Sequence, residues 1–362
     1  MQEGCLLQNE ISHKNVRRTF IRMEIENATS TATAVEDVVF STYGERQLIA
    51  AFYGVVAVVG TVGNCLVLLA VLLSRKLRTV PNVFVVNLSI ADLISSLSVP
   101  WQAVAVLSVD KWPLPDWVCT MGALGVLIPI GCSLDTLALI AVNRVVLITR
   151  TKATYQRLYR RRWIAVMVIA AWALPLTIAS LPLVSHIVEF GFDSVFGTCG
   201  WDSWNPNSPI YALILAVASY PVQLCTIIAC YLAILVHLCK HHKALTMRVH
   251  DEQASVQDTT SVFTVGSAAA PVPLAPRPAQ RNHRRRQIAV TKNLFFVVCA
   301  FFLCTTPYAI CIMLQGTQKL LPYVTVLLFA NSCLNPFIYA TKHPDFKKAF
   351  GCMLRFRFRS IP

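Results

Sequence analysis

The sequence is poor in charged residues, and poorest in acidic ones. Charged residues make up 14% of its 362 positions, with 18 Asp and Glu against 32 Lys and Arg, whereas hydrophobic residues make up 55%. Soluble proteins carry about 25% charged residues. The composition therefore argues against a soluble domain and favours a membrane protein.

Patterns for catalysis are also missing from the sequence. It shows no nucleophile–base set, no phosphate-binding loop and no cluster of metal-ligand residues, so we predict that the protein is not an enzyme. We find no internal repeat, which argues against the transporters that are built from duplicated halves. The region 1–46 has no compact apolar core, so we predict no removable signal peptide and expect the first apolar segment to target the membrane.

Seven long apolar segments dominate what is present. They cover residues 48–74, 81–107, 117–142, 163–185, 209–238, 288–314 and 320–341. Each segment can cross a hydrocarbon core of about 30 Å as a helix, whereas barrel strands would alternate in polarity. We therefore predict an all-α membrane protein, a bundle of seven helices. The start of the fifth segment is the least well defined, because Pro206, Pro209 and Pro221 interrupt it.

The basic residues indicate how the chain lies in the membrane. Lys and Arg gather after the first, third, fifth and seventh segments, whereas the connections on the other side carry almost only Lys111 and Lys319. By the positive-inside rule, the N-terminus is extracellular and the C-terminus cytoplasmic. We predict a multi-pass protein of the plasma membrane whose basic face meets membrane lipid, and no binding of nucleic acid despite the net charge of +14.

The segments divide the chain into three predicted regions. Residues 1–46 form an extracellular tail, 47–341 the seven-helix domain, and 342–362 a short amphipathic eighth helix with a cytoplasmic tail. The intracellular connection at about 239–287 is rich in Ala and Pro in its middle and is predicted to be disordered. Its basic end, Arg281–Arg286, is expected to extend the sixth helix.

Two positions outside the spans match patterns for covalent modification. Asn27 opens an Asn-Ala-Thr sequon on the predicted outer tail, which predicts an N-glycan. Phe346 and Phe350 are four residues apart with lysines between them, the pattern of a helix that lies in the membrane interface with its aromatic residues toward lipid. Cys352 follows at membrane height, as a palmitoylation site or as an unmodified cysteine.

Few polar side chains occur inside the apolar segments. Those that we single out are Asn64, Asp92, Ser133, Asp135, Asn331, Ser332 and Asn335. A lone buried carboxylate must be protonated, paired or bound to an ion. If Ser133, Asn331, Ser332 and Asn335 face Asp92, their oxygens form a small-cation site of sodium type; the alternative is a hydrated hydrogen-bond network without a specific ion.

Two cysteines lie at the outer mouth of the predicted bundle, apart from Cys5 in the outer tail. Cys119 begins the third segment, and Cys199 lies in the only long outer connection. Because this side is oxidising, we predict a disulfide that holds the connection over the mouth of the bundle.

Several short motifs together resemble the rhodopsin-like (class A) G-protein-coupled receptors over roughly residues 46–356. In chain order they are Gly63-Asn64, Asn87–Leu93, Trp112, Cys119, Asn143-Arg144, Trp172, Pro307 and Asn331–Tyr339. The resemblance implies an extracellular ligand, an outward movement of the sixth helix and nucleotide exchange on a heterotrimeric G protein. Arrestin and a receptor kinase are further partners that it suggests.

The same resemblance assigns residues to coupling and activation. These are Asn143, Arg144, Tyr231, Pro307, Asn335, Pro336 and Tyr339. Proline removes a backbone hydrogen bond, so Pro307 and Pro336 are expected pivots of the sixth and seventh helices. We hypothesise that Tyr339 swings toward Arg144 and Tyr231 in the active state.

The chain departs from the family pattern around Arg144. Asn143 replaces the usual aspartate, Val145 the usual tyrosine, and Gln287 the acidic residue common at the base of the sixth helix. We therefore expect signalling without ligand. Thr305 replaces the tryptophan that acts as a rotamer switch in most relatives.

The ligand is less well specified than the class. The Asn-Arg pair and the seventh segment resemble the melatonin receptors and related orphan receptors, although Pro182 and Ser203 depart from the polar residues expected there. Val126 occupies the place of the aspartate that binds biogenic amines, and Phe329 that of the lysine that binds retinal. An amine or a retinal ligand is therefore not expected.

We predict a mainly apolar ligand pocket that suits a lipid, an indole-like molecule or a hydrophobic peptide end. Its candidate residues are Gln102, Val126, Ile130, Tyr308, Cys311, Gln315 and Thr325. The alternative function is an ion channel or transporter that uses Asp92 as its ion site.

Overall fold

The computed structural model describes residues 39–185, 187–203, 205–258, 278–314, 317–357 and 361; for 241–258, 278–290, 292, 293 and 318 it describes the backbone alone. Asn27 and Gln315 lie outside the described residues, and the side chain of Gln287 lies outside the described side chains.

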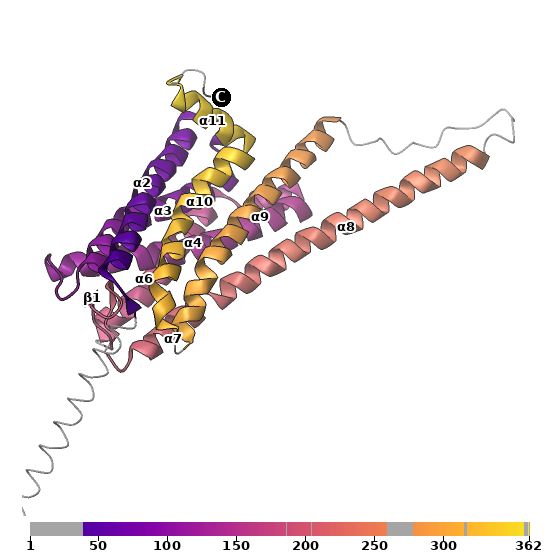
Figure 1. Cartoon of the computed structure of the whole chain (residues 1–362). Helices are drawn as coiled ribbons and strands as arrows, with labels where there is room; N and C mark the ends of the chain where they lie inside the picture. Colours follow the sequence, from indigo (N-terminus) through magenta and orange to yellow (C-terminus); the bar gives the residue numbers. More distant parts are fainter. Residues whose placement is uncertain are drawn as a thin grey trace, which may run out of the picture.

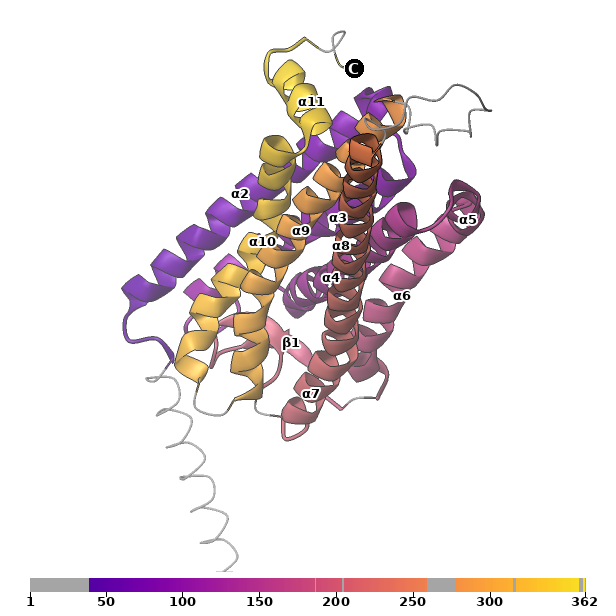
Figure 2. The same ribbon diagram turned by 90° about the vertical axis from the view of Figure 1, so that its right-hand side faces the viewer.

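Seven helical spans form one bundle, as predicted (Figures 1 and 2). Their bounds are α2 Tyr43–Leu73, α3 Val80–Leu107, α4 Asp116–Thr149, α6 Arg161–Ser185, α7 Ser208–Ser219 continued by α8 Pro221–Asp258, α9 Pro278–Met313 and α10 Leu321–Lys342. Among the described residues, these seven are long and apolar enough to cross a membrane.

Shorter elements mark the two ends of the bundle. They are η1 Arg75–Leu77, α5 Lys152–Leu158, η3 Gln318–Leu320, α11 Pro344–Leu354 and the antiparallel strands β1 Phe190–Asp193 and β2 Thr198–Trp201. The strands pair Phe190 with Trp201 and Asp193 with Thr198. The hairpin lies at the end opposite α11, so we call the two ends of the bundle the hairpin end and the α11 end (Figure 1).

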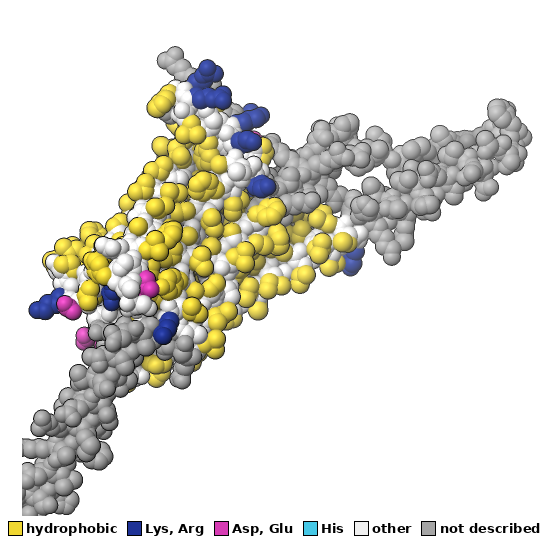
Figure 3. Space-filling model, viewed as in Figure 1, with side chains coloured by type: hydrophobic (Ala, Val, Ile, Leu, Met, Phe, Trp, Pro, Cys, Tyr) yellow, Lys and Arg dark blue, Asp and Glu magenta, His cyan; other side chains and the backbone are white. Residues whose placement is uncertain are grey.

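Apolar side chains cover the flanks of the bundle. Large hydrophobic residues such as Val58, Ile169 and Leu303 are exposed on the outer faces of their helices. Figure 3 shows a mainly hydrophobic surface between the two ends, with Lys and Arg gathered near α11. This is the surface that a lipid environment requires.

The fifth span is broken near its middle. Tyr220 separates α7 from α8, because Pro221 has no N–H to continue the helical hydrogen bonds. Beyond the break, α8 continues to Asp258, and α9 begins at Pro278. Both ends of the predicted disordered connection at 239–287 are therefore helical, since no Pro or Gly interrupts residues 239–258. Its middle, 259–277, lies outside the described residues.

The predicted amphipathic eighth helix is α11, but its apolar face contacts protein. Phe346 is 0% exposed, and Phe350 and Met353 are buried with it in the cluster at the α11 end. The ring of Phe346 stacks on Tyr339 at 5.4 Å, whereas Lys347 is exposed. The aromatic face therefore anchors α11 to the bundle, rather than to lipid as predicted.

Candidate functional site: a covered cavity and a buried arginine

The hairpin is fastened to the bundle by covalent and hydrogen bonds. The predicted disulfide is present: Cys119 of α4 is bonded to Cys199 of β2, with the Cα atoms 5.1 Å apart. On α3, the Gln102 amide donates from Nε2 to the Cys199 carbonyl at 2.8 Å and accepts from the Cys199 N–H at 2.9 Å. One residue of the hairpin is thus joined to two helices.

The turn of the hairpin is ordered by a buried carboxylate. Asp193 accepts hydrogen bonds from the backbone N–H groups of Val195, Phe196 and Ser203, at 2.9, 3.2 and 2.9 Å. Burial raises the pKa of the Asp193 carboxyl above its usual value, against the lowering effect of these bonds. Gly197 then takes a left-handed conformation with φ +58°, and a Cβ there would lie 3.3 Å from the Val106 Cα.

The turn reaches into the apolar interior of the hairpin end. Val195 is buried in a cluster that includes Val126 and Phe329, and Phe196 packs against that cluster. Arg46 of α2, 7% exposed, secures the same region: its Nη1 donates to the carbonyls of Val106 and Ser108 at the end of α3. The turn therefore covers the space between the helices.

A cavity of about 220 Å³ lies beneath this cover. Five predicted ligand contacts line it: Gln102, Val126, Ile130, Tyr308 and Thr325. The lining does not include Cys311. Residues that the sequence did not indicate include Pro175, Ile178, Phe190, Phe196, Leu215, Tyr220 and Leu328. The hairpin residues among them belong to the alternating run Phe190–Trp201, a weak strand signal that could have placed them.

Several polar groups at this cavity are engaged within the protein. Gln102 uses both ends of its amide on Cys199 and so holds the hairpin; that it also contacts the ligand stays a prediction. Thr325 Oγ1 donates to the Leu321 carbonyl at 2.7 Å, and Thr305 Oγ1 to the Phe301 carbonyl at 2.9 Å. Among the described lining residues, Asp193 is the one acid, and both of its oxygens accept backbone hydrogen bonds.

The predicted small-cation residues are buried together halfway through the bundle. Asn335 Nδ2 donates to Asp92 Oδ2 at 2.6 Å, and Ser133 Oγ to Asp92 Oδ1 at 3.4 Å. Asn331 and Ser332 are buried on α10, where the Ser332 carbonyl accepts from Asn64 Nδ2 at 2.9 Å.

The chemistry of this cluster fits a hard monovalent cation. The side-chain oxygens of Asn331 and Asn335 are buried and accept no hydrogen bond from the described residues. With the Asp92 carboxylate and the Ser133 hydroxyl, they form a set of oxygen donors and one negative charge. Among the described residues, no three His, Cys, Asp or Glu side chains gather as a site for a transition metal would need.

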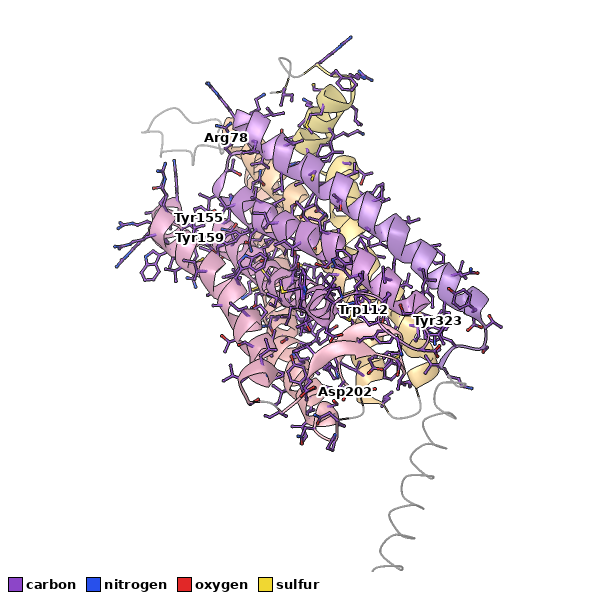
Figure 4. The ribbon with its side chains drawn as sticks, turned by 90° about the vertical axis from the view of Figure 1, so that its left-hand side faces the viewer. Arg78, Trp112, Tyr155, Tyr159, Asp202 and Tyr323 are labelled. Atoms are coloured by element: carbon purple, nitrogen blue, oxygen red, sulfur yellow. A yellow bond between two sulfur atoms is a disulfide. The ribbon has the colours of Figure 1, made fainter. Side chains whose placement is uncertain are left out.

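The Asn143-Arg144 pair is buried at the α11 end. Asn143 is 1% and Arg144 3% exposed. Asn143 Nδ2 donates to the hydroxyl of Tyr155 on α5 at 3.1 Å, and the Tyr155 ring stacks on Tyr159 at 4.8 Å. Figure 4 shows both tyrosines at the end that carries Arg78, away from Trp112 and Tyr323. Burial raises the pKa of Tyr159 to about 12, so its hydroxyl is neutral at physiological pH.

The remaining activation residues do not all meet in this conformation. Arg144 interacts electrostatically with the hydroxyls of Tyr155 and Tyr231. Tyr231 lies edge-on to Phe295 at 5.1 Å, whereas Tyr339 is stacked on Phe346. Pro307 lies inside α9 and Pro336 inside α10. That Tyr339 moves toward Arg144 stays a prediction.

A family profile described as "7 transmembrane receptor (rhodopsin family)" matches residues 63–339. The chain belongs to this family. Its fold resembles that of squid rhodopsin with a TM-score of 0.70, at 20% identity, over 89% of this chain and 88% of that one. The resemblance inferred from the sequence motifs is confirmed, and a channel or transporter is not favoured.

Two of the similar receptors are named after different ligands. Neuropeptides B/W receptor type 2 of Homo sapiens is 29% identical over 326 residues, covering 85% of this chain and 86% of that protein. The 5-hydroxytryptamine receptor 4 of Cavia porcellus is 27% identical and covers 86% of this chain and 80% of that protein. G-protein coupled receptor moody of Drosophila melanogaster is 25% identical over 82% of this chain, which spans about half (49%) of moody.

Proposed function

We propose that this chain is a plasma-membrane receptor that binds an extracellular ligand at the covered cavity and activates a heterotrimeric G protein. The observation that carries the proposal is Arg144, a cation buried at the α11 end of α4 beside Tyr231. The hairpin end is extracellular and the α11 end cytoplasmic, because the basic connections lie at the α11 end. Arrestin and a receptor kinase are proposed further partners at that end.

The ligand is proposed to be neutral and largely apolar, such as a lipid or an indole-like molecule. The cavity is lined mainly by hydrophobic side chains, and Gln102, Asp193 and Thr325 direct their polar groups to the protein's own backbone. A biogenic amine needs a carboxylate that is not already engaged, and Val126 stands where amine receptors have one. A long peptide does not fit within about 220 Å³ beneath the hairpin, although a peptide end does.

Two features of the receptor are proposed to regulate it. Asp92, Ser133, Asn331, Ser332 and Asn335 are the residues that would hold an allosteric sodium ion, whose charge would favour the compact bundle. Asn143 places an amide next to Arg144 in the sequence, where the family has a carboxylate. Because an amide offers no negative charge to Arg144, we propose measurable signalling without ligand. An N-glycan at Asn27 and a palmitoyl group at Cys352 stay predictions.

The test compares G-protein dissociation in cells that express the native chain or Arg144→Ala at equal surface levels. We expect the native chain to signal above mock-transfected cells and Arg144→Ala to fall to the mock level. Lys111→Ala, which removes an exposed cation at the hairpin end, is the matched control and should signal normally. Equal coupling by Arg144→Ala, or a native signal no higher than mock, contradicts the proposal.

A further inference from the structure

The break in the fifth span is joined to two other helices by hydrogen bonds. The Tyr220 hydroxyl shares a hydrogen bond with Thr306 Oγ1 of α9. Gln223 Nε2 donates to Asp135 Oδ1 of α4 at 2.7 Å. Asp135, one of the few ionisable residues inside the apolar segments, thereby has a partner. The two bonds lie on either side of Pro221, where the helix is interrupted.

Tyr220 connects the cavity with the weakest point of α9. Its side chain lines the cavity together with Thr305 and Leu134. Its bonding partner, Thr306, directly precedes Pro307. Because Pro307 has no N–H, α9 lacks one backbone hydrogen bond there and bends more easily than an unbroken helix. The Tyr220–Thr306 bond therefore ties the cavity wall to the residue beside the hinge.

Tyr220 also supplies the aromatic ring that α9 lacks at this level. Thr305 stands in place of an aromatic residue, and its hydroxyl is bonded to the Phe301 carbonyl of its own helix. The Tyr220 ring instead lies edge-on to Phe302 of α9 at 5.7 Å. A group that enters the cavity thus meets an aromatic side chain of the fifth span, which in turn contacts the sixth.

The Asp135–Gln223 bond fixes the other side of the break. Gln223 is buried, and its bond to Asp135 holds the start of α8 against α4. Tyr220 precedes Pro221 with φ −111° and ψ −53°; its N–H donates to the Ala216 carbonyl at 3.2 Å, and its carbonyl accepts from the Leu224 N–H at 3.0 Å. The backbone at Tyr220 and the start of α8 are both held in place, so rotation of the Tyr220 side chain is the way in which its bond to Thr306 can break.

We propose that the Tyr220–Thr306 hydrogen bond is the contact through which an occupant of the cavity controls the sixth helix. The intact bond holds α9 in the arrangement in which Tyr339 stacks on Phe346, away from Arg144. A ligand that displaces the Tyr220 hydroxyl breaks the bond and frees α9 to bend at Pro307. This inference rests on the proposed function, since it specifies how ligand binding reaches the G protein.

A double-mutant cycle tests the contact without a known ligand. Tyr220→Phe, Thr306→Val and the double variant are reconstituted in lipid nanodiscs, and ligand-free nucleotide exchange is measured on purified heterotrimeric G proteins. Each single variant should raise exchange roughly three- to tenfold, the effect of one hydrogen bond on a two-state equilibrium. The double variant should exceed neither single variant, because both delete the same bond. Thr226→Val, whose hydroxyl bonds only to Val222 of its own helix, should change nothing.

Thermal unfolding of the same variants separates the ways in which the idea can fail. Each single variant should lower Tm by about 2–4 °C, again without additivity. Non-additive Tm values with unchanged or reduced nucleotide exchange would show a merely structural bond and overturn the inference alone. Additive effects on exchange overturn it as well. If every variant and the native protein fail to promote exchange while the Tm cycle still shows coupling, the proposed function is wrong, and this inference falls with it.

Discussion

Replacing Gln102 by leucine will loosen the hairpin that covers the cavity. Gln102 is 3% exposed and makes two hydrogen bonds to the Cys199 backbone, at 2.8 and 2.9 Å. Each such bond contributes about 1 kcal/mol net, so their loss costs about 2 kcal/mol. Leucine has a similar volume, which keeps any cavity small. A cost of about 2 kcal/mol corresponds to a roughly thirtyfold larger population of the opened hairpin.

Hydrogen exchange of the backbone amides in 190–201 measures this opening directly, because exchange reports local unfolding. We expect faster exchange there and little change in the buried parts of α3 and α4. Ser98→Ala is the matched control, since Ser98 on the same helix bonds only to the Ile94 carbonyl of that helix. A hairpin that exchanges at the native rate, with the disulfide intact, would refute the assigned role of Gln102.

Three further outcomes are expected. Asn143→Asp places a carboxylate beside buried Arg144. This ion pair should stabilise the resting state by on the order of 1 kcal/mol and so lower ligand-free G-protein activation several-fold. Unchanged signalling at equal surface expression would speak against this. Asp92→Asn should abolish any dependence of Tm on sodium at constant ionic strength, with potassium as the control salt, and a persisting sodium effect would place the ion elsewhere. Burial raises the pKa of the Asp193 carboxyl in the folded protein. The folded state therefore gains stability from the protonated carboxyl in acid, and it loses this contribution as the pH rises through the pKa of the folded state. The Tm of the native protein should therefore fall relative to Asp193→Asn as pH rises above about 4, the ordinary pKa of an aspartate, and parallel pH profiles of the two proteins would contradict this.

The parts of the fold that depend on local sequence were predictable. Seven spans follow from runs of apolar residues, and α11 from the spacing of Phe346 and Phe350. The disulfide followed from topology, because Cys119 and Cys199 fall on one side of the membrane whatever the packing. The Asp92 cluster was predictable because few polar residues occur at that depth.

Contacts between distant backbone segments were not predictable. Gln102 was assigned to the ligand, but its partner Cys199 is 97 residues away, and nothing local indicates that their groups match. The Tyr220–Thr306 bond likewise depends on the geometry of the break between α7 and α8 at Pro221, which a hydropathy pattern does not reveal. The burial of Phe346 against Tyr339, rather than lipid, is a property of tertiary packing.

The engagement of polar groups around the cavity has a consequence for the discovery of ligands. Gln102 and Asp193 already have backbone partners, so a donor or acceptor placed against either of them must break an existing bond before it gains one. Added methyl groups or rings, in contrast, gain contact with surfaces such as Ile130 and Phe329 at no such cost. Within a compound series, potency should follow shape and apolar area more closely than the number of polar substituents.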